Sequence, residues 1–315
     1  MIVTLTLNPS VDRTVEVETL ARGEVMRALR VRVDPGGKGI NVSRALAAHN
    51  LPTRAVVAVG GAEGEHLIAL LRDTGIEIVP VRIEGAIRSN ITVVEPDGTT
   101  TKFNEPGAQL SAEELAAVVS AVQSAVESAD WLVASGSLPP GTPADVYADL
   151  VQRLVGSGIC VAVDTSGPAL EAVLAAGPTL VKPNRDELAE VTGDELMTIA
   201  DVVEAANRLR DRGAGAVLAS LGADGAVLVD DDGAVHGRTP PVPQLSSVGA
   251  GDAMLAGFLA GGGKGADALT EALAWGAAAV LQPGSGMPSP DEIDRGAVQL
   301  ERYGAERRGL LAMPP

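Results

Sequence analysis

Several residue types are scarce in this chain of 315 residues, and each scarcity excludes a class of protein. The one cysteine, Cys160, cannot form a disulfide within the chain, so we expect a reducing compartment, the cytoplasm. Three scattered histidines, without a His/Cys cluster, argue against a permanent zinc site. Lys and Arg number 24 against 41 Asp and Glu, and the net charge of −17 argues against nucleic acid or an anionic membrane as a partner.

Aromatic side chains and long apolar runs are also lacking. Aromatics make up 2% of a chain that is 46% hydrophobic, so the core must consist mainly of Ala, Val, Leu and Ile. No apolar run approaches the roughly 20 residues needed to span a bilayer, and the N-terminus lacks the basic and apolar regions of a signal peptide. We therefore expect a soluble protein with one large α/β domain over residues 1–315.

Short β-rich segments alternate with helical patterns along most of the chain. Segments such as 161–163 are apolar on both faces, which is typical of a parallel sheet covered by helices on each side. Repeated alternation predicts βαβ units and therefore a doubly wound α/β fold. The expected strands cover residues 2–7, 55–59, 131–134, 160–164, 179–182, 216–221 and 226–229, and the expected helices cover 40–49, 64–74, 112–128, 143–155, 186–192 and 199–212.

Two regions, about 13–33 and 79–103, depart from this pattern because polar and apolar residues alternate along them. Pro96-Asp97-Gly98, between strand-like flanks, is a hairpin turn signal. We expect a small antiparallel β lid over the carboxyl edge of the main sheet, where ligands of such folds bind. The tail beyond Gly304 is expected to be loosely held.

The most informative motif is Gly249-Ala250-Gly251-Asp252, followed by an apolar run that predicts a helix. A glycine turn that opens a helix points backbone N–H groups and the positive end of the helix dipole at one spot, which makes an anion site. A carboxylate beside an anion is repulsive unless it has a chemical task, such as taking a proton from a hydroxyl that attacks a phosphoryl group. The alternative is that Asp252 interacts with the helix dipole and does nothing more.

A second glycine turn, from Gly36 to Gly39, opens another helix and carries Lys38. It is not a P-loop, since Gly39 stands where that motif needs Ser or Thr. The turn at 249–254 does not complete a dinucleotide fingerprint either, because Met254 occupies the third glycine position, so a nucleotide-dependent oxidoreductase is a weak alternative. Three glycines around one lysine favour a functional loop over a solvated one.

Further polar residues follow expected strands or lie in the lid region. Asp12 comes after the first strand, where it either holds sugar hydroxyls or forms a plain turn. Arg88 offers a guanidinium suited to phosphate, or else a solvated charge at a sheet edge, and Asn90 lies beside it. Ser137 follows strand 131–134 and brings a hydroxyl to the same edge of the sheet.

Two segments are candidates for nucleotide binding. Asn184 begins a helix with Glu187 at the capping-box position, so both residues have a structural explanation. In the functional alternative they face Mg²⁺–nucleotide through water. Ser220, Gly222 and Gly225 belong to a turn that either cradles nucleotide phosphates or ribose or forms an ordinary hairpin.

Together these motifs resemble those of the ribokinase-like sugar kinases, the phosphofructokinase B family. Two family signatures occur in order, GGKGINVSRA at 36–45 and VGAGD at 248–252, and the match runs from about Val3 to about Pro290. Segments 6–12, 104–107, 135–141 and 163–168 look like those of the 1-phosphofructokinase and tagatose-6-phosphate kinase branch.

The resemblance implies a ribokinase-like, mostly parallel sheet flanked by helices, and it implies roles for individual residues. Asp252 would be the general base, and the N–H groups of Gly249, Ala250 and Gly251 would form the anion hole. ATP and Mg²⁺ are the implied cofactors, a need for a monovalent cation such as K⁺ stays open, and the lid could form a homodimer interface. The implied sugar ligands are Asp12, Gly37 and Asn41, the sugar-phosphate ligands are Lys38, Arg88, Asn90 and Ser137, and the Mg²⁺–ATP ligands are Asn184, Glu187 (to Mg²⁺ through water), Ser220, Gly222 and Gly225.

The implied activity is that of an ATP-dependent kinase converting fructose 1-phosphate into fructose 1,6-bisphosphate. Fructose 6-phosphate and tagatose 6-phosphate remain alternative substrates, because fructofuranose is nearly two-fold symmetric and a pocket that grips one phosphate can present either end to Asp252. A non-catalytic sugar-phosphate sensor is an alternative of another class. The carboxylate of Asp252 argues against it, since a binding protein gains nothing from an acid beside a phosphate.

Overall fold

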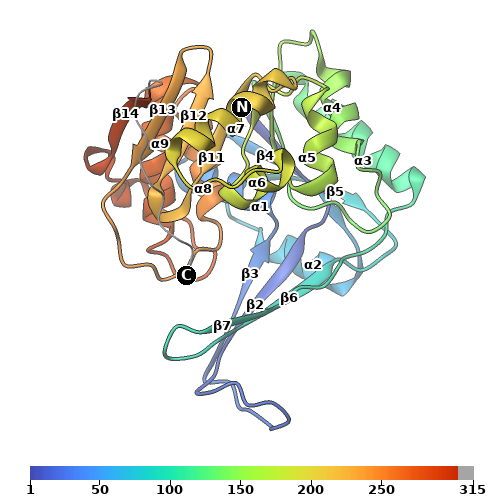
Figure 1. Cartoon of the computed structure of the whole chain (residues 1–315). Helices are drawn as coiled ribbons and strands as arrows, with labels where there is room; N and C mark the ends of the chain where they lie inside the picture. Colours follow the sequence, from blue (N-terminus) through green and yellow to red (C-terminus); the bar gives the residue numbers. More distant parts are fainter. Residues whose placement is uncertain (304–315) are drawn as a thin grey trace.

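A long, mostly parallel sheet forms the centre of the computed structural model, which describes residues 1–303 (Figure 1). Its strands from β11 to β5 run parallel, and the three at the other edge are antiparallel. The tail beyond Gly304 lies outside the described residues. The order across the sheet is β14 (Gln299–Tyr303), β13 (Gly233–Arg238), β12 (Ala226–Asp230), β11 (Ala216–Ser220), β10 (Leu180–Val181), β9 (Cys160–Asp164), β8 (Trp131–Ser135), β1 (Ile2–Thr6), β4 (Thr53–Val59) and β5 (Glu77–Arg82).

Helices cover both faces of this sheet, which confirms the expected doubly wound α/β fold (Figure 1). Successive side chains of a strand point to opposite faces, so Ile2 belongs to one core and Val3 to the other. One face packs against α1 (Lys38–Ala48), α8 (Ala250–Ala260) and α9 (Gly265–Ala279), and the other packs against α3 (Ala112–Ala125), α4 (Val146–Leu154), α5 (Gly167–Leu174), α6 (Arg185–Thr192) and α7 (Ile199–Asp211).

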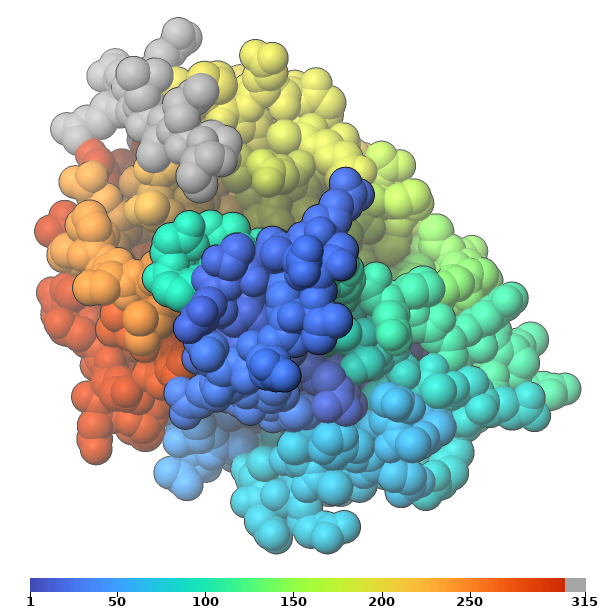
Figure 2. Space-filling model, turned by 90° about the horizontal axis from the view of Figure 1, so that it is seen from below, coloured from blue at the N-terminus to red at the C-terminus, as the bar shows by residue number. Residues whose placement is uncertain are grey.

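A separate four-stranded sheet forms the lid and projects from the main body (Figure 1). Seen from below, its blue and teal segments lie in front of the body (Figure 2). The two outer strand pairs are antiparallel, as expected, and the central pair is parallel. The base of the lid shares a small apolar cluster with α1 and with α2 (Gly61–Leu70). The lid order is β3 (Arg30–Gly36), β2 (Ser10–Glu16), β6 (Arg88–Val94) and β7 (Thr100–Phe103).

The structure corrects the expected limits of the lid. The second region was expected from residue 79, but β5 pairs with β4 in the main sheet, and the lid strand begins at Arg88. An edge strand is half exposed, so β5 shows the same polar and apolar alternation as a lid strand, and Pro80 is tolerated there. The expected turn at Pro96-Asp97-Gly98 is confirmed, with Gly98 at a φ of 89° between β6 and β7.

The elements that were not expected from the sequence include the strands β13 and β14 and the helix α5. β14 is the edge strand and is largely exposed, and β13 beside it is only partly buried, so both lack the apolar pattern of the inner strands. Within residues 1–303, no helix is long and apolar enough to cross a membrane.

Candidate active site

The turn before α8 adopts the conformation that its glycines predict. Gly249 caps the helix with a φ of 81°, in the left-handed region that favours glycine. Ala250, Gly251 and Asp252 form the first turn, whose N–H groups have no acceptor within the helix. Ala250 donates weakly to Ser247 O at 3.4 Å. The start of α8 therefore has the geometry of an anion site.

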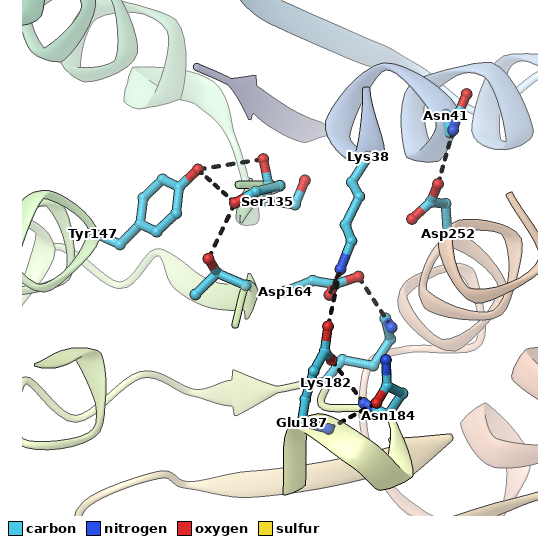
Figure 3. Close-up of polar contacts among 11 residues, drawn as sticks. Lys38, Asn41, Ser135, Tyr147, Asp164, Lys182, Asn184, Glu187 and Asp252 are labelled. Carbon is cyan, nitrogen blue, oxygen red and sulfur yellow. Dashed lines mark hydrogen bonds and ion pairs between the residues drawn. The ribbon is translucent and has the colours of Figure 1, made fainter. Parts of the chain in front are cut away.

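Asp252 is buried in this turn, with 7% of its surface exposed. Its Oδ2 accepts a hydrogen bond of 2.8 Å from Asn41 Nδ2, which joins α8 to α1 (Figure 3). Burial, together with the nearby negative charge of Asp164, raises the pKa of Asp252 to about 6. A carboxylate with a pKa near neutrality is suited to accept a proton from a hydroxyl group.

Two lysines meet the buried carboxylate of Asp164 at the end of β9 (Figure 3). Lys38 donates to Oδ1 at 2.7 Å, and Lys182 Nζ lies 3.0 Å from Oδ2. Burial alone would raise the pKa of Asp164, but the two lysines lower it. Burial likewise opposes the charge of Lys38, but Asp164 and Glu187 raise the pKa of Lys38. The carboxylate of Asp164 and the ammonium of Lys38 are therefore both charged at neutral pH.

Both ammonium groups of this cluster lie near the anion site. Lys182 is only 5% exposed, and its Nζ stands 3.4 Å from the place that a Cβ on Gly251 would occupy. Lys38 lies close enough to Asp252 to lower the pKa of that carboxyl. Positive charge beside the helix start adds to the attraction for a phosphate group.

A cavity of about 460 Å³ lies on one side of the anion site. The first turn of α8 and apolar residues of α9 form one wall, and the end of β11 with the following turn forms another. This volume suits a nucleotide-sized ligand. Four of the five residues predicted to bind nucleotide line the cavity, namely Asn184, Ser220, Gly222 and Gly225.

Glu187, the fifth, is not among the cavity's lining residues within the described chain, but it lies beside Asn184 in α6. The predicted capping box is confirmed: each residue accepts the other's backbone N–H at 2.8 Å. Glu187 Oε1 lies 3.7 Å from Lys38 Nζ.

A carboxylate beside bound phosphate groups would suit Mg²⁺, which takes one or two carboxylates with waters and substrate phosphates. Residues 1–303 contain no cluster of three His, Cys, Asp or Glu residues that could hold a metal alone.

On the other side of the anion site, the base of the lid gathers polar side chains. Asp12 Oδ1 accepts hydrogen bonds from Asn90 Nδ2 at 2.9 Å and from Ser10 Oγ at 2.7 Å. A Cβ on Gly36 would overlap the carboxylate of Asp12, so this glycine allows β3 to approach. Gly37, with a φ of 121°, caps α1 directly behind this group.

The predicted phosphate ligands Arg88 and Ser137 are brought together through Asn8. Arg88 Nη2 donates to Asn8 O at 3.1 Å, and Asn8 Nδ2 lies 3.3 Å from Ser137 Oγ. Arg88 Nε and Asn90 Oδ1 are buried without a hydrogen-bond partner among the described residues. Buried polar atoms need a partner, so these two atoms favour a polar ligand at this place. Lys38, also predicted as a phosphate ligand, lies instead with Asp164 and Glu187.

Three residues of the site were missed by the sequence analysis: Asp164, Lys182 and Arg44. Asp164 is the last residue of the buried strand β9 and Lys182 directly follows β10, so their positions at the sheet edge could have indicated the site. Arg44 stands three residues after Asn41, on the same face of α1, and its Nη1 lies 3.2 Å from Asn41 Oδ1.

The fold defines a class of protein, together with a site that has a cavity on one side of the start of α8 and polar side chains of the lid on the other. The chain belongs to the pfkB family of carbohydrate kinases, whose family model matches residues 5–292.

Individual relatives match almost the whole chain. The 1-phosphofructokinase of Rhodobacter capsulatus is 40% identical over 299 residues, covering 93% of this chain and 94% of the relative. The ATP-dependent 6-phosphofructokinase isozyme 2 of Escherichia coli is 37% identical, covering 96% and 99%. A crystal structure of Escherichia coli phosphofructokinase-2 in complex with potassium is similar with a TM-score of 0.87 and 37% identity, covering 93% of this chain and 96% of that one.

Proposed function

We propose that this protein is an ATP-dependent kinase of a ketohexose phosphate and that it converts fructose 1-phosphate into fructose 1,6-bisphosphate. The observation that carries the proposal is the place of Asp252. Its buried carboxylate stands at the start of α8, between a nucleotide-sized cavity and the polar base of the lid. The two ligands would therefore meet at this carboxylate.

Asp252 would act as general base. It takes the proton of the accepting sugar hydroxyl while that oxygen attacks the γ-phosphorus of ATP, and ADP leaves from the opposite side. The N–H groups at the start of α8 would stabilise the charge of the transferred phosphoryl group. Lys182 and Lys38 would contribute positive charge at the same point. Lys38 would therefore not serve the sugar phosphate alone.

ATP would occupy the cavity, with its phosphates toward Gly251 and the turn at Ser220 and Gly222. Glu187 and Asn184 would hold Mg²⁺ through water, and the ion, when bound, offsets the charge of the nucleotide phosphates. Potassium as an additional cofactor is proposed only on the likeness to the Escherichia coli structure in complex with potassium. Comparing rates in KCl and in NaCl tests this requirement.

The sugar phosphate would lie under the lid. Asp12, Gly37 and Asn41 would hold the sugar hydroxyls, and Arg88, Asn90 and Ser137 would hold the phosphate already present. The unpartnered Arg88 Nε and Asn90 Oδ1 support this placement. Fructose 6-phosphate is the second candidate substrate, because a relative that is 37% identical is named a 6-phosphofructokinase. Tagatose 6-phosphate is the third.

A coupled assay of ADP formation tests the proposal with these three sugar phosphates and with fructose. We expect the highest kcat/KM with fructose 1-phosphate. A higher kcat/KM with fructose 6-phosphate or tagatose 6-phosphate would transfer the assignment to that substrate. A preference for unphosphorylated fructose would contradict a site built around a sugar phosphate, and sugar binding without turnover would make the protein a sensor.

We further propose a single domain over residues 1–315, a homodimer formed through the lid, and a cytoplasmic location in keeping with the single cysteine. Six of the twelve large apolar side chains that are exposed within residues 1–303 belong to the lid strands or their connections, among them Val25, Leu29 and Phe103. Such a concentration favours contact with a second protein surface.

A further inference from the structure

Arg44 is a cation on α1 that the proposed chemistry does not use. It is half-buried, and its Nη1 lies 3.2 Å from Asn41 Oδ1 and 3.0 Å from Ser285 Oγ. Pro35 O lies at 3.5 Å from the same nitrogen. Arg44 therefore joins α1 to the loop that follows α9, directly behind the side chain that contacts Asp252.

The Arg44 contact determines which way the Asn41 amide faces. A guanidinium can only donate hydrogen bonds, so the atom of Asn41 that faces Arg44 must be the carbonyl oxygen. The amide nitrogen then points the other way and donates to Asp252 Oδ2 at 2.8 Å. Within residues 1–303, the side-chain hydrogen bond to Asn41 Oδ1 comes from Arg44.

We infer that Arg44 is a positioning residue: it holds the Asn41 amide so that its nitrogen, and not its oxygen, faces the carboxylate of Asp252. The inference rests on the proposed function only in giving Asp252 a catalytic task. A flipped amide would place its carbonyl oxygen against a carboxylate oxygen, which disfavours the charged form of the acid that must accept the proton.

The remaining charges around Asp252 come from other elements. Asp164 of β9 raises its pKa, whereas Lys38 of α1 and Lys182 after β10 lower it. None of these three side chains contacts Arg44 by hydrogen bond or ion pair among the described residues. Loss of Arg44 should therefore act mainly through Asn41 and through removal of its own positive charge.

Ser285, which contacts Arg44, lies in a loop that packs against the lid. Ser285 follows Gly284, and a Cβ on Gly284 would overlap the guanidinium of Arg32 in β3. The loop that fixes Arg44 is thus packed against the strand that covers the sugar side of the site. Ser285 is itself buried, so its hydroxyl meets Arg44 inside this packed region.

The test is the pH dependence of Arg44→Met compared with wild type, with Arg82→Met, an exposed arginine on β5, as the matched control. We expect the midpoint of the acidic limb of kcat/KM to rise by about one pH unit. The rate would then fall about tenfold at pH 5.5 and stay nearly unchanged at pH 8.5. Arg44→Lys, which keeps a donor, should restore most of the wild-type midpoint, and Arg82→Met should not shift it.

A second readout does not depend on turnover. In protein labelled with ¹³C at aspartate carboxyl groups, NMR titration should show a higher pKa for the Asp252 signal in Arg44→Met, with the signal assigned from Asp252→Asn. If Arg44→Met does not fold, Arg44→Leu, whose side chain is shorter, uncharged and without a donor, carries the same prediction.

An unchanged titration of Asp252 in the folded variant would overturn the inference, as would an equal loss of rate at every pH. If the wild-type protein is inactive but Arg44→Met still shifts the titration of Asp252, the result would contradict the proposed function. It would still support the positioning role of Arg44.

Discussion

Two opposing effects act on the pKa of Asp252, and their balance determines the pH at which the side chain is charged. Burial and Asp164 raise its pKa to about 6, while Asn41 and the two nearby lysines favour its charged form. The group is thus charged at neutral pH and loses its charge as the pH falls through about 6. Since only the charged form can accept a proton, the rate should decrease below that pH.

Replacing Asp252 by Asn tests its task directly. The amide keeps the size of the side chain but cannot accept a proton, so we expect kcat to fall by ~10²–10⁴-fold. Calorimetry should show that sugar-phosphate binding is largely retained, because the ligands at the base of the lid are untouched. A variant with wild-type turnover would contradict the assignment of the base.

The buried carboxylate of Asp164 stabilises the fold, and its contribution to the free energy of unfolding can be measured. Removing its charge by Asp164→Asn leaves Lys182 buried without a counter-ion, and we expect a loss of about 3–5 kcal/mol in the free energy of unfolding. The pKa of Asp164 is lowered in the folded protein, so its contribution is fully present above its usual 3.8 and is lost as the pH falls below that value.

Urea unfolding at pH 7 and at pH 3 checks this expectation. The difference between wild type and Asp164→Asn should be large at pH 7 and smaller at pH 3. A constant difference would show that lost packing, and not the charge, is responsible.

At the scale of elements, the residues at the start of α6 have two roles. They stabilise the helix, and they contribute to the proposed nucleotide site. Asn184 caps the helix with Glu187 and also lines the cavity. Asn184→Ala should cost about 1 kcal/mol of stability and raise the KM for ATP. Ser111→Ala is the matched control, because Ser111 makes the same capping box at α3, and Ser111 is not among the lining residues of the cavity.

Thermal unfolding and steady-state kinetics separate the two effects. Both variants should lose similar stability, and only Asn184→Ala should change the KM for ATP. An equal change in KM for both would mean that Asn184 acts through stability alone.

The sequence predicted elements well where the apolar pattern is strong. The buried strands β1, β8, β9 and β11, and amphipathic helices such as α7, lie within a few residues of their expected bounds. The edge strands β5 and β14, and β13 next to the edge, were misassigned or missed because a partly exposed strand has a weak apolar signal.

Within the site, the sequence could predict residues but not their partners. The glycine turns and the capping box follow from local rules, so Gly249, Gly37 and Asn184 lie where expected. The pairing of Lys38 with Asp164 joins residues 126 positions apart, and no local pattern indicates it. Such contacts arise from the order of strands in the sheet, which places several strand ends at one edge.

At the scale of the whole molecule, half of the exposed large apolar side chains within residues 1–303 belong to the lid. Phe103 is 55% exposed at the end of β7, and Val25 is 97% exposed in the connection between β2 and β3. A charge at these positions should weaken the proposed dimer, because it would have to be desolvated in the interface. We expect the double variant Val25→Glu, Phe103→Glu to be monomeric and to have a higher KM for the sugar phosphate.

Light scattering after size-exclusion chromatography measures this outcome. Val155→Glu is the control, since Val155 is equally apolar and 72% exposed but lies after α4, away from the lid. A wild-type protein that is monomeric at micromolar concentration would contradict the proposed dimer.

The central claim is that Asp252 lies where ATP and a ketohexose phosphate meet and that it accepts the proton of the attacking hydroxyl. The most direct measurement is ³¹P NMR of a mixture of ATP, Mg²⁺ and fructose 1-phosphate with the enzyme. Wild type should give ADP and a sugar with two phosphate ester signals, and Asp252→Asn should leave the mixture unchanged on the same timescale. Inorganic phosphate as the only new product, or an equal rate with Asp252→Asn, would contradict the account.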